Sequence, residues 1–292
     1  MHKFLVFAIA GACGTVAAQT PATNPMPDGS RDMYVGLGAQ YQPRYDGARH
    51  NKTVALPVLQ IQWSNGIFVS GLSAGMHLSS NPAIEYGPLL SIAPRRDEDG
   101  MGGGIGGVGD GSGGALITTI LPPGGIVPGG AARKSANRLE GMDVIRTRLL
   151  YGGFFNYYFT PRLRLNNSVL YGAGNDRNGL RWRADLQYMM PELAAHHSMA
   201  LSAGVSVVNR AYNNAYFGVS KLENERNSLG AYEANGGVQD AHLGARWNWS
   251  LGPSWMLTSN LQVSRLLGDA KASPLVERPT NVTVSTALAY RF

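Results

Sequence analysis

The 292-residue sequence lacks what several classes of protein require. It contains one cysteine, and 15% of its residues are charged, whereas roughly 25% is typical of soluble domains. A single cysteine excludes a disulfide framework and a metal site built on several thiolates. After residue 20 the chain offers no run of about 20 apolar residues, the length that a helix needs to cross a bilayer. A polytopic helical membrane protein is therefore excluded.

The composition fits a different class of membrane protein. Hydrophobic residues make up 44% of the chain, which excludes general disorder, and the mean hydropathy is -0.13. A transmembrane β-barrel has this character because its strands alternate apolar residues that face lipid with polar residues that face the lumen. The low charged fraction and the near-zero hydropathy together favour a barrel.

The N-terminus predicts export. Residues 1–18 contain one lysine, then an apolar run, and end on the small residue Ala18, which is the pattern of a secretory signal peptide cleaved after that residue. Cys13 lies inside this segment, so the mature protein is expected to have no thiol. Residues 19–31 are expected to be a flexible leading segment in the periplasm, and residues 32–292 the folded domain.

Period-two alternation recurs along the folded domain. In the clearest strand, apolar and polar residues alternate from Val282 to Phe292. Such alternation does not distinguish a soluble sandwich, whose apolar face is the core, from a transmembrane barrel, whose apolar face meets lipid. Aromatic residues beside turns favour the barrel, because interfacial girdles place them there. These residues are Tyr151, Tyr157, Tyr158, Phe159, Trp182, Trp249 and Trp255. The predicted fold class is all-β: a transmembrane antiparallel β-barrel of the bacterial outer membrane.

Connections of two lengths separate the expected strands. Residues 64–66, 160–162 and 252–254 form tight turns, whereas residues 209–236 and 267–279 form long loops. Outer-membrane barrels have short periplasmic turns and longer external loops. Eleven strands are expected, with starts near residues 33, 53, 66, 84, 143, 162, 179, 198, 238, 255 and 281. Because an even number is required, residues 115–120 are the candidate twelfth strand, and ten strands are the alternative.

Residues 100–136 form a glycine-rich insertion. Residues 104–109 match the G-x-G-x-x-G spacing of dinucleotide-binding loops, but more glycine and then Pro122-Pro123 follow where a helix would have to begin. The insertion is therefore interpreted as a flexible loop, and no cofactor is expected.

No pattern of catalytic or metal-binding residues is present. The six histidines lack the H-x-x-x-H and H-E-x-x-H spacings of metal sites, and there is no G-x-S-x-G elbow. His197 and Ser198 are adjacent, but neighbours on a strand point to opposite faces and cannot act together as base and nucleophile. The sequence predicts a protein that is not an enzyme.

The polar faces of the expected strands carry more basic than acidic residues. A basic lumen would favour anions, and the alternative is that the arginines bond to neighbours and fill the interior. Because the basic residues alternate along strands and form no single patch, nucleic-acid binding is not supported. The inward charges are expected to be Arg146, Arg148, Arg164, Arg181, Arg183, Asp185, Asp240 and Arg246, together with Glu85.

Several short motifs stand out along the folded domain. The most specific are Tyr216-Phe217-Gly218-Val219, Leu266-Leu267-Gly268-Asp269-Ala270, Ser273-Pro274-Leu275-Val276-Glu277 and the terminal Tyr290-Arg291-Phe292. Less specific are Pro43-x-Tyr45-x-Gly47, Leu56-Pro57, Gly87-Pro88, Arg96-Asp97-Glu98 and Gly237-Val238-x-Asp240. With these motifs the chain resembles the MipA/OmpV family of outer-membrane proteins, that of the MltA-interacting protein. The glycine-rich insertion departs from the family pattern. So does Gly172-Ala173-Gly174, where family members often carry Gly-Gly-His-Gly.

The resemblance implies a non-enzymatic outer-membrane barrel of Gram-negative bacteria. The founding member looks like a scaffold in peptidoglycan biosynthesis, which raises the effective concentration of its partners for each other. The partners so implied are a lytic transglycosylase and a bifunctional penicillin-binding protein, beside outer-membrane lipid. A narrow anion-preferring pore and a surface adhesin acting through the long loops are the alternatives. Tyr290 and Phe292 lie on one face of the last strand, as expected of an assembly signal.

Overall fold

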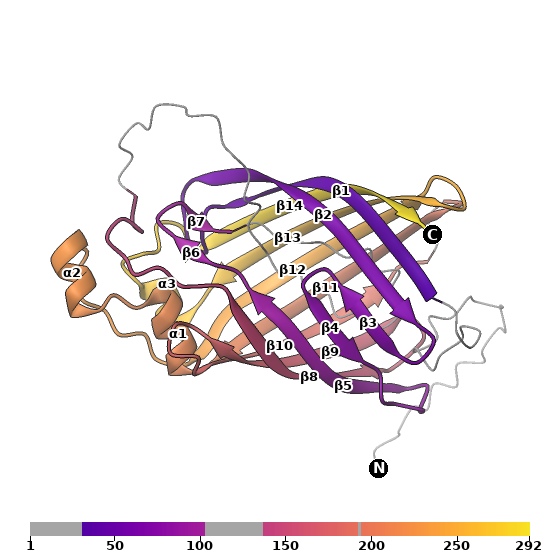
Figure 1. Ribbon diagram of the computed structural model, residues 1–292, viewed down its shortest axis with the longest axis horizontal. Helices are drawn as coiled ribbons and strands as arrows, with labels where there is room; N and C mark the ends of the chain where they lie inside the picture. Colours follow the sequence, from indigo (N-terminus) through magenta and orange to yellow (C-terminus); the bar gives the residue numbers. More distant parts are fainter. Residues whose placement is uncertain (1–30, 103–136, 192–193) are drawn as a thin grey trace, which may run out of the picture.

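The computed structural model describes residues 31–102, 137–191 and 194–292, which form a closed antiparallel barrel of twelve strands (Figure 1). Around the wall the strand order is β1, β14, β13, β12, β11, β10, β9, β8, β5, β4, β3, β2. The first and last strands close the barrel in a register that runs from Tyr34↔Arg291 to Tyr41↔Val284. The predicted fold class is confirmed.

The barrel strands alternate with turns and loops along the chain. They are β1 (Arg31–Pro43), β2 (Asn51–Trp63), β3 (Ile67–Ser70), β4 (Ser73–Met76), β5 (Ile84–Ala93), β8 (Arg148–Tyr158), β9 (Leu163–Ala173), β10 (Gly179–Met189), β11 (His197–Val208), β12 (Gly237–Ser250), β13 (Trp255–Leu266) and β14 (Thr280–Arg291). A separate two-stranded hairpin consists of β6 (Arg96–Asp97) and β7 (Gly100–Met101). The helices are α1 (Arg210–Phe217), α2 (Lys221–Asn227) and α3 (Gly268–Ala272). No helix in the described ranges is long and apolar enough to span a membrane.

The predicted strands agree with the structure except at two places. Ten of the eleven predicted starts lie within two residues of an observed start, but the strand predicted from residue 143 begins at Arg148. The barrel has twelve strands as predicted, and its additional strand is β4. The position predicted for that strand, residues 115–120, lies outside the described residues, as does the predicted signal peptide.

The sequence did not reveal β4 because four residues are too few to show a period-two pattern. Packing explains why this strand contains Gly75. A Cβ at Gly75 would lie 2.5 Å from the Phe68 ring and 2.8 Å from the Pro88 carbonyl oxygen, so only glycine fits there.

The β3–β4 hairpin covers only part of the wall, since a spanning strand needs roughly 9–11 residues. β3 pairs with β2 from Gln60↔Ser70 to Gln62↔Phe68, and Leu59 O accepts a hydrogen bond from Gly71 N. Within the described ranges, residues 51–58 of β2 therefore pair with β1 alone. Residues two apart on a strand direct their backbone groups to the same side, so the backbone of Pro57, like that of Leu59, faces the edge of β2 opposite β1. β3 does not reach Pro57, and a proline has no N–H that would be left unpaired at this edge.

The outer face of the barrel is apolar and the inner face is largely polar. Exposed side chains on the wall include Val35, Leu37, Leu149, Tyr151, Phe155, Trp182, Leu186, Leu243, Leu261 and Leu288, which is the surface expected to meet lipid. Of the predicted girdle, Tyr158 is an exception, because it faces the lumen and is 8% exposed. The inner side of β3, β5, β8 and β9 departs from the predicted polar face, because Phe68, Leu89, Phe154 and Leu170 form a buried apolar cluster there.

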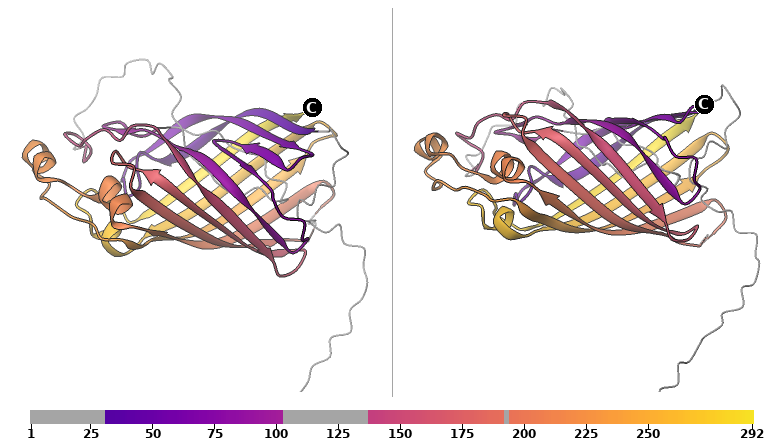
Figure 2. Two further views of the ribbon diagram at one scale, coloured as in Figure 1. Left: turned by 60° about the horizontal axis from the view of Figure 1, so that its bottom comes forward. Right: turned by 90° about the horizontal axis from the view of Figure 1, so that it is seen from below.

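The two ends of the barrel differ. The helices and the long loops 209–236 and 267–279 lie at one end, called here the loop end, in all three views (Figures 1 and 2). The tight turns 64–66, 160–162 and 252–254 lie at the other, the turn end, with the C-terminus. In outer-membrane barrels the loop end is external.

Candidate functional site

The predicted inward charges lie on the inner wall with one correction. Arg181, Arg183 and Asp185 follow one another along β10 on the face opposite the exposed Trp182 and Leu186. Four other strands carry the remaining inward members: Glu85 on β5, Arg148 on β8, Arg164 on β9, and Asp240 and Arg246 on β12.

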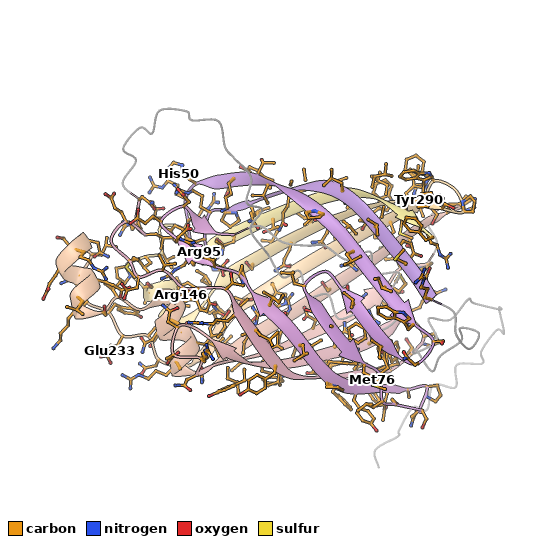
Figure 3. All side chains as sticks on the ribbon, in the orientation of Figure 1. His50, Met76, Arg95, Arg146, Glu233 and Tyr290 are labelled. Atoms are coloured by element: carbon orange, nitrogen blue, oxygen red, sulfur yellow. The ribbon has the colours of Figure 1, made fainter. Side chains whose placement is uncertain are left out.

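Arg146 was wrongly predicted to face the lumen. It is exposed and precedes β8, because that strand begins at Arg148 rather than near residue 143. Its backbone N–H donates to Asn175 Oδ1 over 3.2 Å. Figure 3 shows Arg146 at the loop end, on the same side as His50, Arg95 and Glu233.

Four polar side chains form a continuous chain on the inner wall. Arg183 Nε donates to Asp185 Oδ2 over 2.8 Å. His242 Nε2 lies 2.7 Å from Asp185 Oδ1, and His242 Nδ1 lies 2.7 Å from Asp240 Oδ1. The side chain of His242 is 1% exposed. Its role was missed in the sequence, which places it only on a polar face.

Gly204 makes this chain possible. It lies on β11, the strand between β10 and β12, and a Cβ there would lie 2.7 Å from both Asp185 Oδ1 and His242 Nε2. The glycine thus lets two side chains bond across an intervening strand. A glycine inside an alternating strand was the available signal, since it often marks such a close approach.

Arg164 bonds to neutral partners. Its Nε and Nη2 donate to Gln187 Oε1 over 3.2 and 3.0 Å, and its Nη1 donates to the Tyr158 hydroxyl over 3.0 Å. The residue is 2% exposed. For Arg164 and Arg183, the interpretation that inward arginines bond to their neighbours therefore holds.

Most of the motifs that resemble the family lie at the loop end; the terminal Tyr290-Arg291-Phe292 lies at the turn end, and Leu56-Pro57 and Gly87-Pro88 lie within β2 and β5. Residues 44–50, 94–102, 137–147, 209–236 and 267–279 together form what we call the cap. Within it, Ser273 Oγ donates to Phe217 O over 2.6 Å, and Asn235 N donates to Asp269 Oδ2 over 2.8 Å. Both bonds join loop 209–236 to loop 267–279.

The remaining motif residues of the two loops also have defined positions in the cap. Tyr216, Phe217, Gly218 and Val219 lie at the end of α1, and Val219 forms a bridge with Tyr232. Gly268 begins α3 with φ +48°, a conformation that favours glycine. Arg138 Nη1 donates to Pro274 O over 2.7 Å.

The β1–β2 loop and the β6–β7 hairpin join the cap through polar contacts. The Tyr45 hydroxyl donates to Leu275 O over 3.1 Å, and Gly47 O accepts from Glu277 N over 2.8 Å. Arg96 is 3% exposed and donates to Tyr216 O over 2.6 Å. Burial lowers the pKa of Arg96. These contacts connect segments far apart in the sequence.

An apolar core and helix caps stabilise the cap. Its largest buried cluster consists of Tyr45, Ala48, Leu139, Met142, Val219 and Leu275. Asn209 accepts from Tyr212 N at the start of α1, and Ser220 and Glu223 form a capping box at the start of α2. The same glutamate accepts from Asp143 N over 2.9 Å, which ties α2 to residues 137–147.

A cavity lies between the cap and the lumen, and we call it the vestibule. Its empty volume, counted together with the adjoining open solvent, is about 780 Å³. Charged and polar lining residues come from the β1–β2 loop, four strands and α1; they include Gln42, Asp46, Ser91, Arg181, Tyr212 and Tyr216. Of these six, Arg181 and Tyr216 were singled out from the sequence.

Asp46 is the acidic group of the vestibule. It lines the cavity, and the residue is exposed. Burial, and next the charge of Asp240, raise the pKa of Asp46 to about 6, while Arg181 acts in the opposite direction. This carboxylate is therefore largely ionised at neutral pH and changes charge in mildly acidic solution.

The C-terminal aromatic residues lie at the turn end. The Tyr290 ring contacts those of Trp255 and Phe292 at centroid distances of 5.0 and 4.9 Å. Phe292 N donates to Met33 O over 2.9 Å, and the residue is 67% exposed. Its role as an assembly signal stays a prediction.

In the part of the chain that is described, no group of three or more His, Cys, Asp and Glu side chains is placed to hold a metal ion. His197 instead stacks on Trp247 and Trp249 at centroid distances of 5.6 and 5.3 Å.

Comparison with known proteins identifies relatives of this chain. OmpV, an outer membrane protein of Vibrio cholerae, is 33% identical over 169 residues, which are 54% of this chain and 60% of that protein. The MltA-interacting protein of Escherichia coli K12 is 24% identical over 148 residues, which are 50% of this chain and 58% of the relative. The chain thus matches less than two thirds of each relative's length.

Solved outer-membrane barrels are more distant. A NanC porin structure is 9% identical, with a TM-score of 0.42 over 90% of this chain and 100% of that one. The sequence profile of one family, described as MltA-interacting protein MipA, matches residues 35–292. The chain therefore belongs to the MipA family and is a β-barrel of the outer membrane.

Proposed function

We propose that this protein is a non-enzymatic scaffold of cell-wall growth. In this role it holds a lytic transglycosylase close to a bifunctional penicillin-binding synthase at the inner side of the outer membrane. The family match over residues 35–292, which includes a relative named for its interaction with MltA, is the observation that carries the proposal. Tethering both enzymes to one platform raises the effective concentration of each for the other.

The architecture suits a platform. The inner wall carries hydrogen-bonded polar chains around Asp185 and Arg164, and the long loops are engaged with one another in the cap. A periplasmic partner would meet the turn end, where the tight turns 64–66, 160–162 and 252–254 lie. We therefore assign partner binding to the turn end.

Affinity chromatography tests this assignment. The folded barrel is immobilised, a membrane extract is passed over it, and the eluate is run on a peptidoglycan zymogram. Lytic bands are expected from the wild type and equally from a variant in which residues 221–229 of the cap are shortened, because that segment is at the loop end. Recovery no better than from an unrelated barrel would remove the scaffold role.

An anion-preferring pore is the second candidate. Its supporting observation is that basic residues outnumber acidic ones among the inward charges named above. The basic residues are Arg148, Arg164, Arg181, Arg183 and Arg246, and the acidic residues are Glu85, Asp185 and Asp240. Planar-bilayer recordings test it. Conductance steps whose anion preference falls in Arg181→Ser and Arg183→Ser would support a pore, and steps indifferent to both changes would exclude anion selection by these residues.

A surface adhesin is the third candidate function. The structure of the cap limits which loop residues can be removed to test it. Loops 209–236 and 267–279 hold the cap together, so removing either would disturb the fold. Leu222 of α2 is 69% exposed and offers a contact point. Shortening 221–229 alone should abolish surface binding if the protein is an adhesin; unchanged binding would count against that role.

A further inference from the structure

The vestibule contains two opposite charges that do not pair with each other. Asp46 reaches it from the β1–β2 loop and Arg181 from β10. Among the described residues, neither takes part in an ion pair within 4.0 Å. Asp46 is exposed and Arg181 is half-buried, so both charges are accessible from the cavity. Unpaired charges of opposite sign in one cavity can each bind the opposite charge of a ligand.

Hydrogen-bond donors are in excess on the Arg181 side. An arginine has five N–H donors, and for Arg181 the bond recorded within the described ranges is a long one of 3.5 Å to the Tyr212 hydroxyl. Gln42 lines the same cavity and is 1% exposed. Its Nε2 has no hydrogen-bond partner in the part of the chain that is described, while its Oε1 accepts from Gln40 Nε2 over 3.1 Å.

A guanidinium and an amide N–H together suit a carboxylate, which accepts hydrogen bonds from both. A simple anion would also meet the ionised Asp46, and like charges in one site repel. A simple cation would meet Arg181 in the same way. A ligand that carries both charges satisfies each group, and the rings of Tyr212 and Tyr216 supply walls for its uncharged part.

We propose that the vestibule binds a small zwitterion of the amino-acid or dipeptide class, with its carboxylate at Arg181 and Gln42 and its ammonium group at Asp46. The site lies under the cap, so its ligand enters from the loop end or along the lumen. Binding here is independent of any partner at the turn end.

Isothermal titration of the full-length folded barrel in detergent tests the proposal. The probes are the dipeptide Ala-Ala, N-acetyl-Ala-Ala, which lacks the ammonium group, and Ala-Ala amide, which lacks the carboxylate. We expect Ala-Ala to bind and each blocked probe to bind at least about tenfold more weakly, the order expected for one lost charge-assisted hydrogen bond.

Variants assign the two ends of the ligand. Arg181→Gln and Gln42→Ala should each weaken Ala-Ala binding by about tenfold, and Asp46→Asn should remove the preference for Ala-Ala over its N-acetyl form. Arg226→Gln and Asp143→Asn are matched controls, because these residues form an ion pair of 2.7 Å on the cap outside the vestibule. Heat-modifiable gel mobility checks the folding of each variant.

Three results would overturn the proposal. One is the absence of any heat from Ala-Ala with the wild type. Another is equal affinity for Ala-Ala and N-acetyl-Ala-Ala, which would make this an anion site. The last is wild-type affinity in both Arg181→Gln and Asp46→Asn. If Arg181→Gln does not fold, the probe series on the wild type and the Gln42→Ala variant decide the question.

Discussion

Gly204 lies on β11 beneath the contact between Asp185 and His242, and the wall has no room for a methyl group there. A Cβ at this position would lie 2.4 Å from Ala184 O, 2.7 Å from Asp185 Oδ1 and 2.7 Å from His242 Nε2. The first of these atoms belongs to the backbone of the neighbouring strand and cannot rotate away. Gly204→Ala is therefore expected to shift the strand pair and break the contact between the two side chains.

The expected magnitude follows from three contributions. A hydrogen bond to a charged group stabilises by roughly 1.5–3 kcal/mol, and overpacking typically costs about 1–3 kcal/mol. Alanine recovers roughly 0.5–1 kcal/mol of backbone entropy relative to glycine. We expect the free energy of unfolding to fall by about 3 kcal/mol, which is roughly a 150-fold change in the unfolding equilibrium.

Urea unfolding of the barrel in detergent micelles, followed by tryptophan fluorescence and heat-modifiable gel mobility, measures this change. Gly252→Ala is the matched control, because a Cβ at residue 252 meets nothing within 4 Å. Combining Gly204→Ala with His242→Ala should cost less than the sum of the two single changes, since both disrupt one contact. A Gly204→Ala protein that unfolds at the wild-type urea concentration would refute the crowding argued here.

Three further predictions concern the cap, the vestibule and the last strand. Ser273→Ala removes the hydroxyl bonded to Phe217 O, and tryptic cleavage of the cap should accelerate by about tenfold. The control Ser254→Ala, at the turn end, should leave the cleavage rate unchanged. Equal cleavage rates in Ser273→Ala and the wild type would contradict the role of this bond. Because the pKa of folded Asp46, about 6, lies above its usual 3.8, its ionisation opposes folding, and the associated stability is present below pH 3.8 and lost as pH rises through 6. Asp46→Asn should remove this loss, about 1 kcal/mol after allowance for water in the cavity; unfolding at pH 4 and pH 7 checks it, and identical pH profiles would count against it. Deleting Phe292 should lower the heat-modifiable folded fraction in outer membranes, and an unaltered gel shift would exclude it as an assembly signal.

The alternation of side chains was readable from the sequence because it is a local property. Along β10, Trp182 and Leu186 are outside and Arg181 and Arg183 are inside, as their two-residue spacing required. The same rule failed at Arg146, since the period continues in the sequence for some residues after hydrogen bonding between strands has ended. It also failed for β4, which is held by contacts with Phe68 and β5 rather than by a pattern of its own.

The candidate sites show the limit of such reading. The motif residues Tyr216 to Val219 and Gly268 to Pro274 were recognised separately, but nothing in either segment indicates that Ser273 bonds to Phe217. Likewise, Asp46 and Arg181 are 135 positions apart by their numbers, and only the closed barrel places both in the vestibule.

By itself, the sequence determined the class of protein, the positions of most strands and the two faces of those strands, because these depend on composition and on spacings of a few residues. The tertiary structure decided which strands are neighbours around the wall, which loops meet in the cap and which charges share a cavity. These outcomes depend on ring closure and strand stagger, which bring together residues such as Tyr45 and Leu275 that are 230 positions apart. No local pattern encodes such a contact, since it exists only once the first and last strands have paired.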